Sequence, residues 1–221
     1  MLTATAEKIF TAVKRIYKDL TALDLTILES AGVDDNKVLN WKNFTKLFSK
    51  VGWLMVQSGI IFFLTAMCTT SFTVAVIAQI LELHPERKEE FIYANAFVIF
   101  FFCFEVGLSI SRSSLACFKI RRVQLVTLFH FFLWLLFGLN AFFFFISDIY
   151  VLFFIMILIG FNDGAGYVNV MYQLKISSKI KKAEKELAIN ITTLLNDTSV
   201  LLGALIALTL SFTVFAKYNS D

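Results

Sequence analysis

The sequence predicts an all-α integral membrane protein with five transmembrane helices, and three observations support this fold class. Hydrophobic residues make up 58% of the 221 residues, with 26 Phe and one Pro, whereas apolar residues make up about 45–50% of a soluble domain. Five apolar runs are each long enough for the ~20 residues that a helix needs to cross a bilayer. No Lys or Arg enters the interior of any run. The composition therefore excludes a water-soluble fold.

The five runs are the predicted spans. They lie at about 52–81, 91–110, 123–146, 150–173 and 187–215. The first and the last are long enough to tilt or to project beyond the bilayer.

The N-terminal residues 1–49 form the one extended polar segment. Apolar residues recur there at helical spacing, with basic residues between them; they are Ile9, Val13, Ile16, Leu20, Leu23 and Ile27. This pattern predicts an amphipathic cytosolic segment that lies on a membrane surface or against a partner, and residues 50–221 form the five-helix transmembrane region. Charges interrupt every apolar stretch before residue 49, so the segment is not a signal peptide.

The charges of the loops predict the orientation. Residues 111–122 hold four basic residues and no acid, and residues 174–186 hold five Lys against two Glu. Because basic loops stay on the cytosolic side, both loops should be cytosolic and 82–90 should face the lumen or exterior. The N-terminus is then cytosolic and the C-terminus lumenal.

Three carboxylates lie inside apolar runs: Glu105, Asp163 and Asp197. An ionised side chain at the centre of a bilayer costs roughly 3 kcal/mol or more, so each needs a partner, a solvated cavity or a task. These acids indicate a polar interior, as in a transporter.

The fourth span carries most of the candidate path residues. They are Gly160, Asn162, Asp163, Gly164, Gly166, Tyr167 and Asn169. The glycines allow either close helix contact or local unwinding, and the amides could either bond across helices or line a substrate path. For Asp163 we favour a functional role, because ionisable residues at membrane depth are usually functional.

In the fifth span Asn190, Thr193 and Asp197 share one helical face. A polar stripe of this kind should face the protein interior, as a hydrogen-bonded seam or as the wall of a substrate path. The carboxylate favours the path.

In the second span Glu105 lies two turns before Arg112. Glu105 could form an ion pair with that arginine, or it could have a proton or substrate role. The sequence leaves both alternatives open. Gln57, Thr65 and Cys68 give the first span a weaker polar stripe. The third span, almost all Phe and Leu, should be peripheral and lipid-facing, with His130 as a packing residue rather than a proton relay.

No catalytic constellation, cofactor site or metal-ligand cluster is predicted, and the chain is not expected to be an enzyme. The net charge of +3 does not indicate a nucleic-acid partner, because the basic residues lie in short loops.

Three ordered stretches carry a resemblance to a known family. They are Ser111-Arg112-Ser113-Ser114-Leu115 with the basic cluster ending at Arg122, Gly164-Ala165-Gly166-Tyr167-Val168-Asn169, and the last span from Glu186 through Asp197-Thr198 to Gly203. In this order and spacing they resemble the C-terminal half of the battenin family.

The resemblance implies the C-terminal half of a major-facilitator-like bundle in a lysosomal or vacuolar membrane. It further implies export of glycerophosphodiesters or basic amino acids, a part in organelle pH homeostasis, a polar solute that moves with a proton, and an N-terminal half or partner subunit. Residues 1–49 would then be the connection between halves. The chain departs from the family at Ile159, where members carry an acid, and at Glu105, where they carry an amide. A non-transporting scaffold that regulates trafficking or acidification, and a nucleoside-type carrier, are the alternatives.

Overall fold

The structure is a computed structural model that describes residues 41–113, 119–120 and 122–216. The chain divides into two compact units, Met1–Phe48 and Ser49–Asp221. The predicted amphipathic stripe between Ile9 and Ile27 lies outside the described residues. The second unit contains all five predicted spans.

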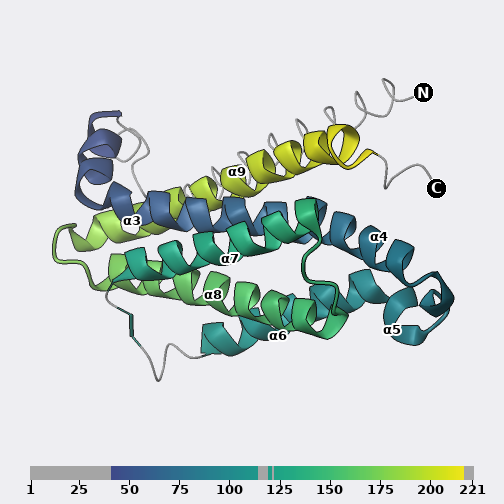
Figure 1. Ribbon diagram of the computed structural model, residues 1–221. Helices are drawn as coiled ribbons and strands as arrows, with labels where there is room; N and C mark the ends of the chain where they lie inside the picture. Colours follow the sequence, from purple (N-terminus) through teal and green to yellow (C-terminus); the bar gives the residue numbers. More distant parts are fainter. Residues whose placement is uncertain (1–40, 114–118, 121, 217–221) are drawn as a thin grey trace, which may run out of the picture. The chain divides into compact units, whose positions relative to one another are not determined.

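The described residues are helical and contain no strand. Their elements are α3 (Trp41–Met67), a π-turn (Cys68–Phe72), α4 (Thr73–Leu83), the 3-10 turn Pro85–Arg87, α5 (Phe91–Ala94), α6 (Ala96–Ser113), α7 (Val123–Phe143), α8 (Ile149–Ile176) and α9 (Lys182–Thr213), as Figure 1 shows.

Five segments have the length and apolar composition of membrane spans. They are Thr45–Leu83, Ala96–Ser113, Val123–Phe143, Ile149–Ile176 and Glu184–Thr213. The predicted all-α class with five spanning helices is confirmed.

The second span begins later than predicted. The sequence suggested residue 91, but Phe91–Ala94 is a separate short helix and α6 begins at Ala96. Asn95 breaks the helix between them with φ −111°, and its amide donates to the carbonyl oxygen of Phe91 at 2.9 Å. Asn side chains compete for backbone groups in this way, which favours a turn.

The third span ends at Phe143 instead of 146. Phe144 adopts a left-handed conformation with φ 47°, as a residue that ends a helix often does. Asn140 stabilises the turn: its carbonyl oxygen accepts from the backbone N–H of Ile146 at 2.7 Å, and its amide donates to the Ile146 carbonyl at 3.3 Å.

The first span is interrupted by the π-turn. The backbone N–H of Thr73 and its hydroxyl both donate to the carbonyl oxygen of Cys68, the hydroxyl at 2.7 Å. An i→i+5 turn inside a helix is rare and often occurs at functional sites. This turn begins three residues after Thr65.

Helices α6 and α8 contact each other backbone to backbone. A Cβ atom on Gly160 would overlap the carbonyl oxygen of Phe104, and one on Gly107 would overlap that of Ile157. A Cβ on Gly164 would lie 2.8 Å from the carbonyl oxygen of Leu108. The glycines of the fourth span are therefore a packing seam, and since α8 is helical throughout, the unwinding alternative is wrong.

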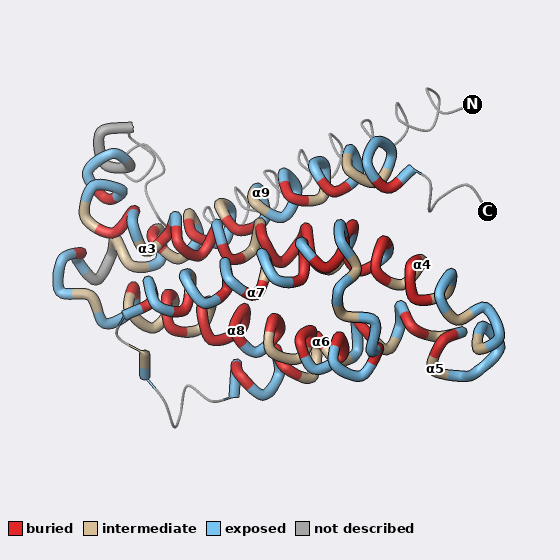
Figure 2. Tube along the Cα trace, viewed as in Figure 1, coloured by how far each residue is buried: buried red, intermediate tan, exposed pale blue. Residues whose placement is uncertain are grey.

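Burial follows the bundle and leaves lipid-facing surfaces on the outer helices. Figure 2 shows buried positions along most of α8, whereas few positions along α9 are buried. The largest fully buried side chains of α6, α7 and α8 are Phe100, Phe137, Leu152, Met156, Ile159, Leu174 and His130.

The sequence suggested that the third span is peripheral and lipid-facing, but helix α7 also has a buried face. One face exposes Leu125, Leu128, Phe129 and Phe132, which suits contact with lipid. The opposite face is buried and carries two polar side chains, His130 and Asn140. The apolar composition of the run concealed this inner face, because Phe and Leu suit both lipid and protein contacts.

Candidate functional site

A hydrogen-bonded chain of three polar side chains joins three helices of the bundle. The hydroxyl oxygen of Thr65, on α3, lies 2.7 Å from Oδ1 of Asp163 on α8 and 3.0 Å from Nε2 of His130 on α7. His130 is 0% exposed and Asp163 is 3% exposed. We refer to these residues as the Thr65–His130–Asp163 chain.

When Asp163 is ionised, the hydrogen bonds of this chain determine where the protons lie. Thr65 has one hydroxyl proton, which it donates to Asp163. Its oxygen must then accept from His130, so Nε2 of the imidazole carries a proton when the ring is neutral. The chain runs from His130 through Thr65 to Asp163, with the carboxylate as the final acceptor.

The other imidazole nitrogen is open to a proton. Nδ1 of His130 is buried and has no hydrogen-bond partner within the described residues. In this tautomer Nδ1 carries a lone pair. A buried acceptor without a partner is costly, and such groups often mark functional sites or the place of a bound water. The free lone pair of Nδ1 is therefore a position where this ring can accept a proton.

Two charged side chains of α6 act on Asp163. Arg112 attracts the negative charge of the carboxylate and Glu105 repels it. Within the described residues Glu105 forms no ion pair, so the open alternative of a Glu105–Arg112 pair is not realised. Instead the guanidinium of Arg112 lies 5.4 Å from the ring centroid of Tyr167, a cation–π distance.

Tyr167 is held between aromatic and cationic neighbours. Its ring also meets Phe62 of α3 edge to face, with centroids 5.8 Å apart. Tyr167 is half-buried one turn from Asp163, which places it beside the polar chain.

The amides of α8 bond to α7 and to the loop before it. Asn162 donates to the carbonyl oxygen of Val126 at 2.9 Å and so joins α8 to α7 next to Asp163. Asn169 accepts from the backbone N–H of Ile120 at 2.8 Å, and Gln173 donates to the Ile120 carbonyl at 3.0 Å. These contacts give Asn162 and Asn169 a packing role.

The polar face of α9 points out of the described bundle. Asn190, Thr193 and Asp197 are exposed on the described bundle, so the interior that the sequence predicts for this stripe is not formed by the described helices, and the prediction stays untested. The buried residues of α9 lie on another face, and Asn196 is 2% exposed, with neither side-chain polar atom hydrogen-bonded to the described residues. Proximity to Asp163 is therefore not observed for Asp197 or Asn190.

The predicted cytosolic loop motif is partly described. Ser111 is buried at the α6–α8 contact, where a Cβ on Gly164 would lie 2.6 Å from its hydroxyl oxygen. Ser113 donates to the carbonyl oxygen of Ser109 at 3.0 Å and thus satisfies the helix end. Ser114 lies outside the described residues.

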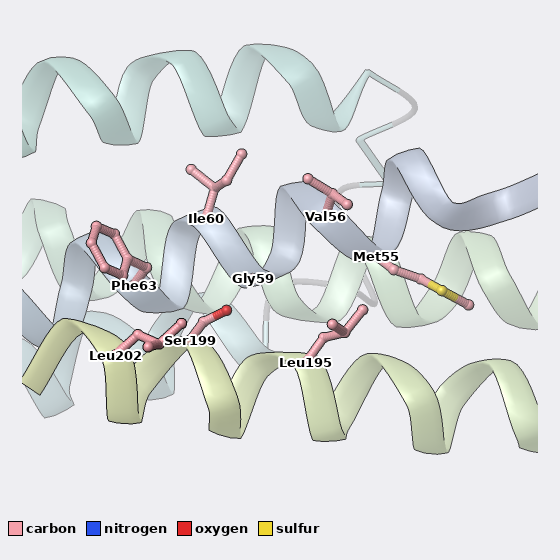
Figure 3. A pocket seen from close by; sticks show the side chains of 8 residues that line it. All are labelled: Met55, Val56, Gly59, Ile60, Phe63, Leu195, Ser199 and Leu202. Carbon is pink, nitrogen blue, oxygen red and sulfur yellow. The ribbon is translucent and has the colours of Figure 1, made fainter. Parts of the chain in front are cut away.

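A separate cavity lies between α3 and α9 (Figure 3) and has a volume of about 240 Å³. Ser199 of α9 points toward α3 at Gly59, where a Cβ would lie 2.9 Å from its hydroxyl oxygen. The other lining residues are apolar: Met55, Val56, Ile60, Phe63, Leu195 and Leu202. It suits an apolar chain better than a polar solute.

The sequence did not indicate that Thr65 and His130 would meet Asp163. Thr65 is one of six Ser and Thr side chains in its run, and His130 is surrounded by Phe and Leu. The available signal was that a histidine at membrane depth is itself an ionisable residue that needs a partner.

Comparison with known proteins identifies the family of the chain. The family model described as CLN3 protein matches residues 38–216. Battenin of Dictyostelium discoideum is 34% identical over 138 residues, which cover 59% of this chain and 31% of that protein. Protein btn1 of Aspergillus fumigatus is 24% identical over 176 residues, which cover 79% of this chain and 37% of that protein.

The matched regions span about a third of the length of these curated relatives. No solved structure matches. The family model covers the described bundle from α3 to the end of α9, including every member of the Thr65–His130–Asp163 chain. The chain belongs to the CLN3 protein family, the family of the battenins, and it is a multi-pass membrane protein.

Proposed function

We propose that this chain forms the C-terminal bundle of a battenin-type solute transporter in a lysosomal or vacuolar membrane, and that the Thr65–His130–Asp163 chain takes up the proton that accompanies transport. The observation that carries the proposal is the buried carboxylate of Asp163, which is hydrogen-bonded through one hydroxyl to a buried imidazole. Ionisable groups at membrane depth line proton relays and substrate paths in transporters. Lysosomes and vacuoles are acidic organelles, which agrees with a proton-accepting site.

Proton uptake can follow the hydrogen bonds. A proton that reaches Nδ1 of His130 makes the ring a cation. The ring then gives its Nε2 proton to the oxygen of Thr65, while the hydroxyl proton of Thr65 passes to Asp163. The imidazole ends neutral with its proton on Nδ1, and Asp163 ends as a neutral acid. No net charge then remains on these three side chains, because the carboxylate has accepted the proton.

Two charged side chains of α6 lie near enough to Asp163 to act on it, the positive Arg112 and the negative Glu105. A solute that contacts either side chain would change how readily Asp163 takes the proton. This is a physical route by which solute and proton could be coupled.

The exposed face of α9 supports a second bundle. Asn190, Thr193 and Asp197 would face lipid if α9 were at the periphery, and a lipid-facing carboxylate is costly. We infer that an N-terminal half or partner subunit covers this face, and that Asn190 and Asp197 then line the path between the halves. Rocking of one half against the other would open the path alternately to each side.

The solute should be polar. A glycerophosphodiester or a basic amino acid needs hydrogen-bonding groups in an apolar surround, and Tyr167, Arg112 and Glu105 lie beside the Thr65–His130–Asp163 chain. Arg112 could attract a phosphodiester, and Glu105 a cationic amino group.

Metabolite profiling of isolated organelles tests the function. The chain is joined to the part of Dictyostelium battenin outside the matched region and expressed in cells that lack battenin. We expect stored glycerophosphodiesters or basic amino acids to fall. A correctly localised protein that leaves both pools unchanged would contradict the transport proposal and support the scaffold alternative.

Two variants test the proton role. Asp163→Asn keeps a carbonyl acceptor for Thr65, and His130→Gln keeps an N–H donor, so both should insert normally, yet neither side chain can carry the proton. We expect each variant to lose transport or its dependence on pH. Asp148→Asn is the matched control: Asp148 lies at the start of the same helix, where it accepts from the backbone of Tyr150 and Val151, and Asn also serves as a helix cap. Unaltered pH-dependent transport by both test variants would rule out the proposed relay.

A further inference from the structure

A polar cleft lies at the end of the bundle that carries the basic loops, away from the Thr65–His130–Asp163 chain. It has a volume of about 560 Å³. It is lined by residues of α3, α7, α8 and the α8–α9 connection: Lys50, Val51, Trp53, Leu54, Gln124, Gln173, Ile176, Ser177, Ser178 and Lys179.

The cleft holds two lysines from different parts of the chain. Lys50 belongs to α3, and Lys179 to the connection after α8. The ammonium of Lys50 lies 3.4 Å from a carboxylate oxygen of Glu184, whereas the exposed Lys179 forms no ion pair within the described residues. None of the described residues that line the cleft is an acid. It therefore presents net positive charge, reduced on one side by Glu184.

The walls of the cleft combine polar and apolar groups. Gln124, Ser177 and Ser178 offer amide and hydroxyl groups beside the lysines. Val51, Leu54 and Ile176 form an apolar wall, and Ile176 is 58% exposed. Trp53 is 63% exposed on this wall. Exposed Trp near the end of a spanning helix is typical of the membrane–water interface.

We infer that this cleft binds the phosphate-bearing headgroup of an anionic phospholipid from the leaflet at this end of the bundle. The two ammonium groups and the hydroxyls suit a phosphate, and the adjacent apolar wall suits the start of the acyl chains. Basic pockets between spanning helices bind phosphoinositide and cardiolipin headgroups in this way. A free phosphate would use the lysines but gain nothing from the apolar wall. The inference does not depend on transport.

A single-tryptophan protein provides the readout. Trp41→Phe and Trp134→Phe leave Trp53 as the one tryptophan of the chain, and the complete chain is placed in nanodiscs of neutral phosphatidylcholine. Dioctanoyl phosphatidylinositol 4-phosphate is titrated while Trp53 fluorescence is recorded. We expect a saturable change. Inorganic phosphate and glycerol phosphate, titrated separately, should bind much more weakly.

Charge variants locate the site. Each lysine near a headgroup contributes enough binding free energy for about a fivefold change in affinity, so Lys50→Gln and Lys179→Gln should each weaken binding about fivefold. Glu184→Gln should tighten it, because it frees Lys50. Gln can still accept at Oε1 from the backbone N–H of Lys181, as Glu184 now does at 2.9 Å, so the start of α9 is kept. Lys88→Gln, an exposed lysine at the opposite end of the spans, is the matched control and should have no effect.

Three results would overturn the inference. The first is no saturable response from a protein whose circular dichroism shows intact helices. The second is equal affinity for inorganic phosphate, which would make the cleft a free-anion site. The third is equal weakening by Lys88→Gln and Lys50→Gln, which would mean general surface charge. If Lys50→Gln fails to fold, the test depends on Glu184→Gln, which should bind the lipid more tightly. Unchanged affinity in Glu184→Gln would then contradict the headgroup site.

Discussion

Thr65 of α3 and Asp163 of α8 are 98 residues apart in the chain and are joined by a 2.7 Å hydrogen bond in the buried part of the bundle. The same hydroxyl bonds His130 of α7. One small side chain thus connects three spanning helices and both ionisable groups of the candidate site.

Removal of this hydroxyl should affect both stability and transport. In Thr65→Val the methyl replaces the hydroxyl at similar volume, so Asp163 and His130 each lose their shared partner. Leaving a buried polar group unpaired costs about 1–3 kcal/mol. We expect a lower thermal unfolding midpoint in detergent and loss of pH-dependent transport. Thr65→Ser retains the hydroxyl and should restore the pH dependence; if Thr65→Val retained it as well, the hydroxyl would not carry the proton.

The α6–α8 contact should not tolerate a methyl group. In Gly160→Ala the new Cβ overlaps the backbone of Phe104, and since backbone cannot rotate away, the helices must separate. Overpacking costs about 1–3 kcal/mol or more, so the folded fraction after detergent extraction should fall. Gly59→Ala is the control: its Cβ meets the hydroxyl oxygen of Ser199 at 2.9 Å, which can turn aside. Equal yields of the two variants would contradict the close approach of α6 and α8.

The loop before α5 should open on acidification. Arg87 donates to both carboxylate oxygens of Glu90 at 2.9 Å and to the hydroxyl of Tyr93 at 2.6 Å. The hydrogen bonds from Arg87 lower the pKa of the Glu90 carboxyl below its ordinary value. A lowered folded-state pKa adds stability above the unfolded pKa, and this stability is lost as pH falls through the folded value.

Hydrogen exchange of the 85–95 segment measures this opening. Protection should persist through mildly acidic pH and fall once pH drops below the ordinary range for Glu. Glu90→Gln should remove that dependence, whereas Glu89→Gln, an exposed neighbour, should leave it in place. If amide protection in the Glu90→Gln variant still changes with pH as in the unaltered protein, another group causes the opening.

The topology remains a prediction from loop charge. Cys68, Cys103 and Cys117 are replaced by Ala, and single cysteines are introduced at Lys181 and Glu86. A membrane-impermeant maleimide should label position 181 from the cytosolic side and position 86 from the opposite side. Labelling of position 181 from the lumenal side alone would reverse the orientation.

The spans were predictable because apolar length and loop charge are local properties of the sequence. The ends of the spans were less predictable from the sequence. The Asn95 break and the left-handed Phe144 depend on single side-chain contacts with backbone, which have no periodic signal. The glycines were correctly recognised as sites of possible close contact, but only the position of α6 distinguished packing from unwinding.

The candidate site was predictable only in part. Asp163 was singled out because a carboxylate at membrane depth has a large energetic cost. Its partners come from helices far away in the chain, and side-chain spacing within one helix cannot show which distant hydroxyl it meets. The inward face predicted for Asn190 and Asp197 is not formed by the described bundle, because a polar stripe shows that a face avoids lipid but not which partner covers it.

The π-turn between α3 and α4 has a mechanical consequence. It holds one residue more than an α-helical turn, and each residue of an α-helix advances it by about 100°. If the extra residue moved one turn toward the N-terminus, the segment it passed would rotate by about that angle and Thr65 would swing away from Asp163. The seating of the Thr65 hydroxyl therefore resists this rotation. Protonation of Asp163 exchanges the donor and acceptor roles at Thr65 but keeps both hydrogen bonds, so the same contacts hold the twist of the 39-residue span in either state.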